Sequence, residues 1–224
     1  MKRPKIFVAC DTTNTKKINN IIKYTESPKL KIGYKFGLEF LNSKNGRKFV
    51  SKLKNKITFG DYKLADIPKT CMSAIKAVKD LKLNYITIHI SSGLNAIRAA
   101  KKVAGSIKVI GVTILTSLDN KSIKEIGFDK KIDKLVLRQA KLAAKAKLDA
   151  IVCSPHEIKI VKKVFKGEII TPGIRLSSDK KDDQKRVMTP KQAIKNGADA
   201  LVIGRSITSG NIKNNIKKII KELK

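Results

Sequence analysis

Eight short apolar runs, each followed by an amphipathic stretch, are the feature that most restricts how this chain can fold. Short apolar runs are typical of strands buried in a parallel sheet, and apolar residues with a helical period indicate amphipathic helices. This alternation is the element order of a (β/α)8 TIM barrel, so we predict a single barrel domain over residues 1–224. An open, doubly wound sheet is the alternative, but no G-x-G-x-x-G follows the first predicted strand.

The apolar and amphipathic patterns also set the bounds of the predicted elements. The predicted strands are residues 6–10, 31–36, 56–60, 85–90, 109–115, 150–154, 168–171 and 200–204. The predicted helices are residues 16–24, 47–54, 71–81, 94–103, 132–146, 156–165, 190–196 and 212–223. The one long polar connection, residues 175–188, follows the seventh strand, and long loops of this kind in compact domains are usually functional lids or disordered segments.

Two carboxylates surround one ammonium in residues 61–68, which read D-Y-K-L-A-D-I-P and follow the apolar run at residues 56–60. Residues i and i+2 of an extended chain project to the same side, so we expect Asp61 and Lys63 to lie together, with Asp66 beyond the next turn. A carboxylate beside an amine keeps the amine charged. A surface ion pair is the simpler interpretation of D-x-K in a lysine-rich chain. The full spacing at the end of a buried strand favours a proton-donating site.

Polar residues with functional potential gather at the carboxyl ends of the predicted strands. In a TIM barrel these ends form the active-site face, and phosphate is commonly held after the seventh and eighth strands. We therefore expect the backbone of Gly204 and the guanidinium of Arg205 to share a phosphate. The other polar positions at this face are Asp11, Lys35, Asp61, Lys63, His89, Thr116, Ser117, Ser154 and residues 171–173.

The net charge of +32 at pH 7 comes mostly from lysine, since only seven of the 50 basic residues are arginine. The lysines are spread over nearly every predicted helix. Arginine is preferred for bidentate recognition of phosphates and bases, so we predict no specific nucleic-acid partner. A basic nucleic-acid-binding protein is the alternative from a different functional class. A positive field would in either case attract a polyanionic small substrate.

We predict no metal site, redox centre or membrane segment. The three cysteines, Cys10, Cys71 and Cys153, are widely spaced without a C-x-x-C, and only two histidines are present, so zinc is not expected. Cys10 and Cys153 fall in apolar runs and are interpreted as small buried residues. No apolar run reaches the length of a membrane span, and the first one is too short for a signal peptide, so we expect a cytoplasmic protein.

Segments along the whole chain resemble the orotidine 5′-phosphate decarboxylase family. Residues 61–68 resemble its D-x-K-x-x-D-I-P signature, with Ala65 at a position where histidine is more common. Residues 112–117 and 151–154 resemble its fifth-strand and sixth-strand segments. Residues 171–175, 182–186 and 203–205 resemble its phosphate-binding end in order and spacing. The resemblance implies cofactor-independent decarboxylation of orotidine 5′-monophosphate to uridine 5′-monophosphate and CO2, in pyrimidine biosynthesis, by a homodimer.

The resemblance also implies roles for individual residues. Lys63 would protonate the C6 carbanion, Asp61 would lie beside the substrate carboxylate, and Lys35 would contact the ribose and pair with Asp61. Asp66 and Thr70 would reach across the dimer interface into the neighbouring site, where Asp66 completes a Lys-Asp-Lys-Asp array. The other implied substrate-binding residues are Asp11, Thr116, Ser117, Pro172, Arg175, Gln184, Gly204 and Arg205.

Two alternatives stay open. Lys31 and Lys35 both fit the K-x-G pattern of the second strand, and we prefer Lys35 because Glu39 then gives K-x-G-x-E. The alternative activity is that of a sugar-phosphate decarboxylase or aldolase of the same barrel superfamily, which uses D-x-K-x-x-D to hold Mg²⁺ and an enediolate. Such an enzyme would not need Lys35 to pair with Asp61.

Overall fold

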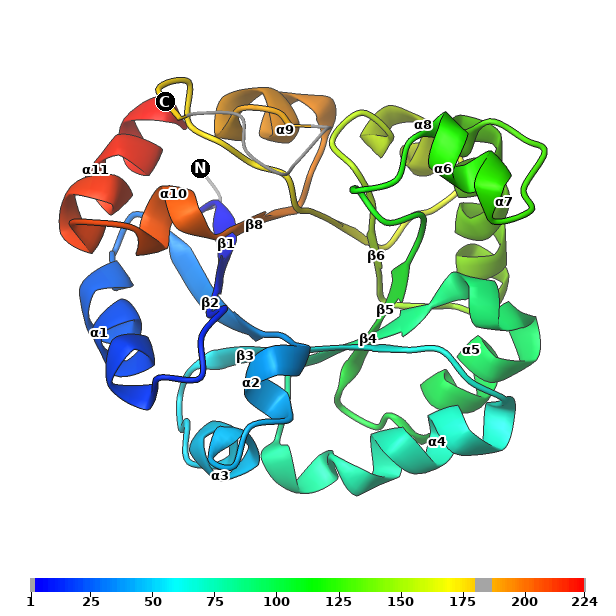
Figure 1. Cartoon of the computed structure of the whole chain (residues 1–224), viewed down its shortest axis with the longest axis horizontal. Helices are drawn as coiled ribbons and strands as arrows, with labels where there is room; N and C mark the ends of the chain where they lie inside the picture. The colour runs from blue at the N-terminus through cyan, green and yellow to red at the C-terminus, as the bar shows by residue number, and fades with distance from the viewer. Residues whose placement is uncertain (1–2, 180–186, 224) are drawn as a thin grey trace.

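The computed structural model describes residues 3–179 and 187–223, in which parallel strands form a closed barrel surrounded by helices (Figure 1). Neighbouring strands pair in chain order, and β8 pairs with β1 to close the ring. The predicted TIM barrel is confirmed, and the open-sheet alternative is wrong. The strands are β1 (Lys5–Ala9), β2 (Lys31–Phe36), β3 (Ile57–Leu64), β4 (Tyr85–His89), β5 (Lys108–Val112), β6 (Ala150–Val152), β7 (Glu168–Thr171) and β8 (Ala200–Ile203).

Helices connect successive strands and cover the outside of the barrel (Figure 1). The α-helices are α1 (Thr15–Thr25), α2 (Leu38–Leu41), α3 (Gly46–Ser51), α4 (Pro68–Ala77), α5 (Gly93–Val103), α6 (Asn120–Glu125), α7 (Ile132–Lys145), α8 (Ile158–Lys162), α9 (Pro190–Asn196), α10 (Arg205–Thr208) and α11 (Ile212–Glu222). Two 3₁₀ turns, η1 (Lys79–Leu81) and η2 (Ile90–Ser92), complete the described helical elements. No helix in the described ranges is long and apolar enough to cross a membrane.

Side chains of unequal size fill the inside of the barrel. Phe7 packs edge-on against Phe59 and Tyr85, with ring centroids 5.1 and 5.2 Å apart. Small residues, among them Ala150 and Ala200, complete the same buried cluster. A Cβ atom at Gly33 on β2 would lie 2.8 Å from the Phe7 ring, so glycine is required where that ring approaches the backbone. The barrel is a packed core that rigidly fixes the strand ends.

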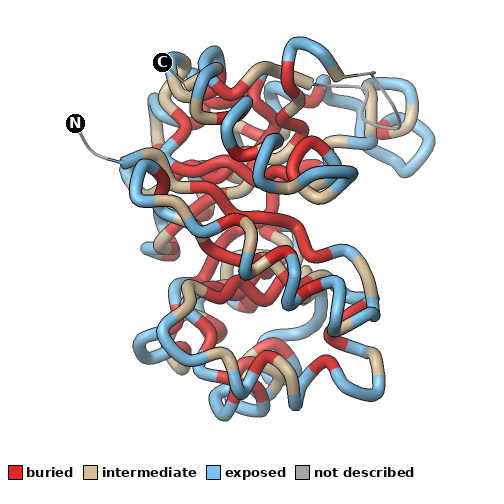
Figure 2. Tube along the Cα trace, turned by 90° about the vertical axis from the view of Figure 1, so that its left-hand side faces the viewer, coloured by how far each residue is buried: buried red, intermediate tan, exposed pale blue. Residues whose placement is uncertain are grey.

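A second, larger apolar layer lies between the strands and the helices. In α1, Ile18 and Ile21 are buried one helical turn apart, and the Asn14 side chain caps the helix by accepting a hydrogen bond from the Lys17 N–H. Figure 2 shows the buried chain running through the middle of the molecule and the exposed chain at its periphery. As predicted, Cys10 and Cys153 are buried, and neither forms a disulfide bond.

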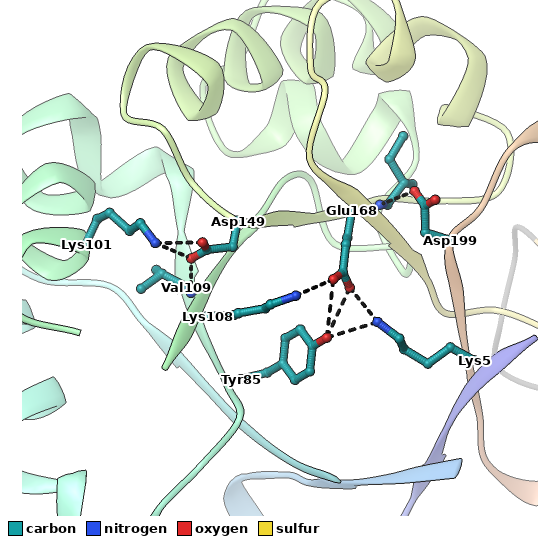
Figure 3. Close-up of polar contacts among 9 residues, drawn as sticks. Lys5, Tyr85, Lys101, Lys108, Val109, Asp149, Glu168 and Asp199 are labelled. Atoms are coloured by element: carbon teal, nitrogen blue, oxygen red, sulfur yellow. Dashed lines mark hydrogen bonds and ion pairs between the residues drawn. The ribbon is translucent and has the colours of Figure 1, made fainter. Parts of the chain in front are cut away.

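The amino-terminal ends of the strands carry a second polar cluster, which we call the floor cluster: Lys5, Tyr85, Lys108 and Glu168 (Figure 3). Each of these residues is the first residue of its strand. Glu168 accepts hydrogen bonds from both lysines and from the Tyr85 hydroxyl. The nearby Asp149 carboxylate accepts from Lys101 Nζ and from the Val109 N–H. None of these contacts was predicted from the sequence.

Several predicted bounds are wrong at the carboxyl ends of the strands. β3 runs to Leu64, so Asp61 and Lys63 lie within the strand and not after it. Its pairing with β4 shifts register between Gly60 and Leu64, which lets the strand continue past the predicted end. β5 ends at Val112 and not at the predicted Leu115: the Thr113 N–H and hydroxyl both donate to the Val152 carbonyl, and the chain then bends at Ile114.

The helix predictions fail where a helix is short. α2, α6 and α10 were not predicted, since each has at most six residues and too few turns to show a helical period. α8 covers Ile158–Lys162 in place of the predicted residues 156–165. The chain before it makes a tight turn in which the Glu157 carboxylate accepts from the Ser154 N–H. The prediction for residues 190–196 matches α9.

Candidate active site

A cavity of about 470 Å³ opens at the carboxyl ends of the strands, where the sequence predicted the site. Its polar wall is formed by Asp11, Lys35, Asp61, Lys63, Thr116, Arg175 and Arg205. Its remaining lining is backbone or apolar: Ala9, Phe59, Val112, Ile114, Leu115, Val152, Pro172, Gly173, Val202 and Gly204. The cavity therefore combines charged groups with an apolar lining, as small-molecule sites commonly do.

Asp61 lies between two lysines on this wall. Its Oδ2 atom is 2.8 Å from Lys63 Nζ and 3.3 Å from Lys35 Nζ. Lys35 Nζ also lies 3.4 Å from Asp11 Oδ1. Lys35 is at the carboxyl end of β2, whereas Lys31 begins that strand at the other end of the barrel. Of the two lysines that fit the sequence pattern, only Lys35 reaches the cavity.

The electrostatics of this group favour the charged forms of Asp61 and Lys35. Burial acts to raise the pKa of Asp61, but Lys35, Lys63 and a hydrogen bond from Thr87 outweigh it and hold that pKa below its ordinary value. Burial acts to lower the pKa of Lys35, but Asp61 and Asp11 outweigh it, and the pKa of Lys35 is raised. The array is a carboxylate held ionised between ammonium groups in a largely desolvated wall.

His89, at the end of β4, lies close enough to Lys63 and Asp61 to feel their charges. Burial, followed by the positive charge of Lys63, lowers the pKa of His89. The neutral imidazole is therefore the favoured form near neutral pH. His89, named from the sequence among the polar positions at this face, ends β4 but does not line the cavity.

Basic and backbone groups line the cavity across the barrel from Asp61. Pro172, Gly173 and Arg175 follow β7, and Gly204 and Arg205 follow β8. Arg175 is anchored through its backbone, because its N–H donates to the Met188 carbonyl. Two guanidinium groups and a glycine backbone at this place form a suitable phosphate site. Gln184, predicted to join them, lies outside the described residues.

Not every predicted site residue reaches the cavity of its own chain. Ser117 is exposed and does not line it, whereas Thr116 does. Asp66 and Thr70 are exposed on the outer surface around the start of α4. The Asp66 carboxylate accepts a hydrogen bond from the Ile67 N–H, and Ile67 itself is 64% exposed.

Sequence reasoning missed Thr87 and the apolar lining. Thr87 is fully buried in β4, and its hydroxyl donates to Asp61 Oδ1 over 3.1 Å. The available signal was a threonine between two isoleucines, Ile86 and Ile88, in a buried strand. Ile114 and Leu115 were assigned to a strand and instead form cavity wall. Within residues 3–179 and 187–223, no three His, Cys, Asp or Glu side chains are grouped so that they could hold a metal ion.

Comparison with known proteins supports the same family as the motifs. The profile of the family described as "Orotidine 5'-phosphate decarboxylase / HUMPS family" matches residues 4–219. A relative named orotidine 5'-phosphate decarboxylase, from Prochlorococcus marinus, is 42% identical over 218 residues, covering 91% of this chain and 88% of its own. A relative of the same name from Coxiella burnetii is 41% identical over 217 residues, covering 92% and 90%.

A solved structure gives the same result for the fold. The crystal structure of orotidine 5'-phosphate decarboxylase from Lactobacillus acidophilus matches this structure with a TM-score of 0.82 at 31% identity, covering 99% of each chain. The family match and the relatives confirm the resemblance seen in the sequence motifs. The chain therefore belongs to the orotidine 5′-phosphate decarboxylase / HUMPS family.

Proposed function

We propose that this protein decarboxylates orotidine 5′-monophosphate to uridine 5′-monophosphate and CO2 in pyrimidine biosynthesis. The observation that carries the proposal is the buried Asp61 carboxylate, held between Lys35 and Lys63 at the cavity wall. Arg175 and Arg205 line the same cavity from β7 and β8. A substrate with a phosphate at one end and a carboxylate at the other would place the phosphate beside the two arginines and the carboxylate beside the group formed by Lys35, Asp61 and Lys63.

Substrate binding would begin at the phosphate. Arg175, Arg205 and the Gly204 backbone hold it, while Asp11 and Lys35 meet the ribose hydroxyls. Thr116, which lines the cavity, contacts the edge of the pyrimidine. The ring would then lie against the apolar lining around Val112 and Ile114. Binding energy from the distant phosphate holds the ring in the reactive position, which is how remote contacts raise the rate of a chemical step.

The chemical step follows from the charges beside the ring. Asp61 lies next to the substrate carboxylate, and the two negative charges repel each other. This repulsion is relieved as CO2 leaves C6. The C–C bond electrons remain on C6 as a carbanion, which the Lys63 ammonium stabilises and then protonates. A preorganised charge in a water-poor site is often the largest catalytic contribution. Asp61, accepting from both lysines, holds the proton donor in place.

The family name covers more than one activity, so the family match alone does not choose the reaction. The relatives at 41–42% identity are both named for the decarboxylase, and Lys35 lies within ion-pair distance of Asp61. The Mg²⁺-dependent sugar-phosphate alternative would use Asp61 and Asp66 of this motif as metal ligands. Asp66 does not line the cavity of its own chain, so the Lys35–Asp61 pair and the names of the relatives carry the choice of reaction.

We further propose that the active form is a homodimer in the cytoplasm. Asp66 and Thr70 would complete the partner's site, and the exposed Ile67 beside Asp66 would be covered by the partner. The three cysteines are buried and form no disulfide bond, which suits a reducing compartment. Mixing the inactive variants Lys63→Ala and Asp66→Ala tests the shared site, because a mixed dimer contains one intact site. Sedimentation as a monomer, or no activity from the mixture, would contradict the dimer.

Loss of the orotate absorbance band, with EDTA present, tests the reaction directly. We expect purified protein to consume orotidine 5′-monophosphate rapidly and Lys63→Ala to be inactive while folded. A folded wild-type dimer that leaves the band unchanged would contradict the proposal. Mg²⁺-dependent turnover of a sugar phosphate by that protein would establish the alternative.

A further inference from the structure

The strand that carries Asp61 and Lys63 is irregular where the two residues occur. Gly60 pairs with Ile86 and Leu64 pairs with Ile88, so β3 has two more residues than β4 between these pairs. Lys63 adopts a left-handed backbone with φ of 48°, which costs free energy for a residue with a side chain. A local conformation of this kind persists only where its surroundings hold it.

Thr87 is the β4 residue opposite this irregular stretch, and its hydroxyl binds both ends of it. The hydroxyl oxygen accepts the Lys63 backbone N–H over 2.8 Å and donates its own proton to Asp61 Oδ1 over 3.1 Å. Thr87 is fully buried, so water does not replace these bonds. The Lys63 N–H therefore has a fixed acceptor although the regular pairing of β3 with β4 is interrupted there.

The two bonds fix different parts of the catalytic group. One holds the backbone from which the Lys63 side chain extends, and the other occupies the Asp61 oxygen that the lysines leave free. Lys35 and Lys63 both approach Oδ2, so the Thr87 bond to Oδ1 sets the rotation of the carboxylate. We propose that Thr87 is a positioning residue, whose hydroxyl aligns the Lys63 ammonium and the Asp61 carboxylate for proton delivery to C6. This inference rests on the proposed function of Lys63.

The test compares Thr87→Val, which keeps the shape and removes the hydroxyl, with Thr87→Ser, which keeps the hydroxyl. A displacement of reacting groups by about 1 Å can cost about 100-fold in rate. We expect Thr87→Val to lower kcat by about 10- to 100-fold, with KM nearly unchanged because the phosphate contacts are intact. Thr87→Ser should restore most of kcat. The acid limb of the kcat profile should move to higher pH in Thr87→Val, since Asp61 loses a hydrogen bond to its ionised form.

Thr58 on β3 provides a matched control. It is buried, and its hydroxyl donates to Asn84 Oδ1 and accepts the Asn84 N–H, but it does not line the cavity. Thr58→Val should lower stability without lowering kcat or moving the pH profile. Equal loss of kcat in Thr58→Val and Thr87→Val would reduce Thr87 to a structural role and overturn the inference. Wild-type kcat in Thr87→Val would overturn it as well.

Carbon NMR of the labelled Asp61 carboxyl separates this inference from the proposed function. If the wild-type protein does not turn over orotidine 5′-monophosphate, the proposed function fails. An upward shift of the Asp61 pKa in Thr87→Val, absent in Thr87→Ser, would still support the Thr87 contact. An unchanged Asp61 pKa would overturn it. If Thr87→Val does not fold, the smaller Thr87→Ala variant takes its place in every comparison.

Discussion

The two ends of this barrel carry similar groups that have different surroundings. At the carboxyl end of the strands, Asp61 lies between Lys35 and Lys63 and faces a cavity. At the amino end, Glu168 lies between Lys5 and Lys108 (Figure 3). Both carboxyl groups have a pKa below the ordinary value: burial opposes the shift in each case, and the neighbouring lysines outweigh it.

The two clusters differ in whether their charged groups line the active-site cavity and can contact a bound molecule. Tyr85 adds its hydroxyl to the floor cluster, while its ring packs on the aromatic core below. The floor cluster thereby ties β1, β4, β5 and β7 together. At the active-site cavity, Lys63 and Lys35 form part of the wall beside Thr116, Arg175 and Arg205, so their ammonium groups can reach a molecule bound there. An ion cluster at one end stabilises the barrel, and one at the other end is available for chemistry.

Removing Lys63 should produce the largest difference between the two ends. In the proposed mechanism, Lys63→Ala loses both the proton donor and the charge that stabilises the carbanion, so kcat should fall by at least about 10⁴-fold. Steady-state decarboxylation with the variant and the wild type checks this. Lys108→Ala, the same change in the floor cluster, should keep wild-type kcat. Substantial residual turnover in Lys63→Ala would contradict its role as the proton donor.

Removing a phosphate contact should have a smaller effect. Arg205→Ala should raise KM and lower kcat/KM by about 50-fold, the scale expected for one lost charged hydrogen bond. Arg47→Ala is the matched control, because Arg47 pairs with Asp80 on the outer surface, away from the cavity. Equal kinetics for Arg205→Ala and Arg47→Ala would show that Arg205 does not bind substrate.

A substitution in the floor cluster should lower the stability of the protein and leave its activity unchanged. Glu168→Ala leaves Lys5 and Lys108 facing each other, and we expect the free energy of unfolding to fall by about 2 kcal/mol. Urea unfolding measures this, and kcat should remain at the wild-type value. Asp80→Ala, which breaks the exposed pair with Arg47, should cost less than about 1 kcal/mol. A large loss of kcat in Glu168→Ala would contradict the assignment of the floor cluster to stability alone.

The pH dependence of stability should show the smallest effect. Because the folded pKa of Glu168 is depressed below its ordinary value of 4.5, its contribution to stability is present above that value. The contribution is lost as the pH falls through the lower, folded pKa. Unfolding of the wild type and Glu168→Gln should therefore differ at neutral pH and converge in acid. If the difference in the free energy of unfolding between the two proteins grew on acidification, the prediction would be wrong.

Much of the site could be predicted because it follows from local pattern and from the barrel rule. The spacing of Asp61, Lys63 and Asp66, and the positions of Arg175 and Arg205, are read directly from the order of residues and strands. The contact of Thr87 with Asp61 could not be read in this way, because it depends on a register shift between β3 and β4. A two-residue irregularity leaves no periodic signal in the sequence.

The sequence alone determined the eightfold alternation, the family motif and the end of the barrel at which the chemistry would gather. These features depend on neighbours along the chain, where apolar period and residue spacing are visible. Only the tertiary structure decided between Lys31 and Lys35, placed Thr87 beside Asp61 and brought Lys5, Tyr85, Lys108 and Glu168 together. Those contacts join different strands, and their geometry is set by strand register and barrel closure.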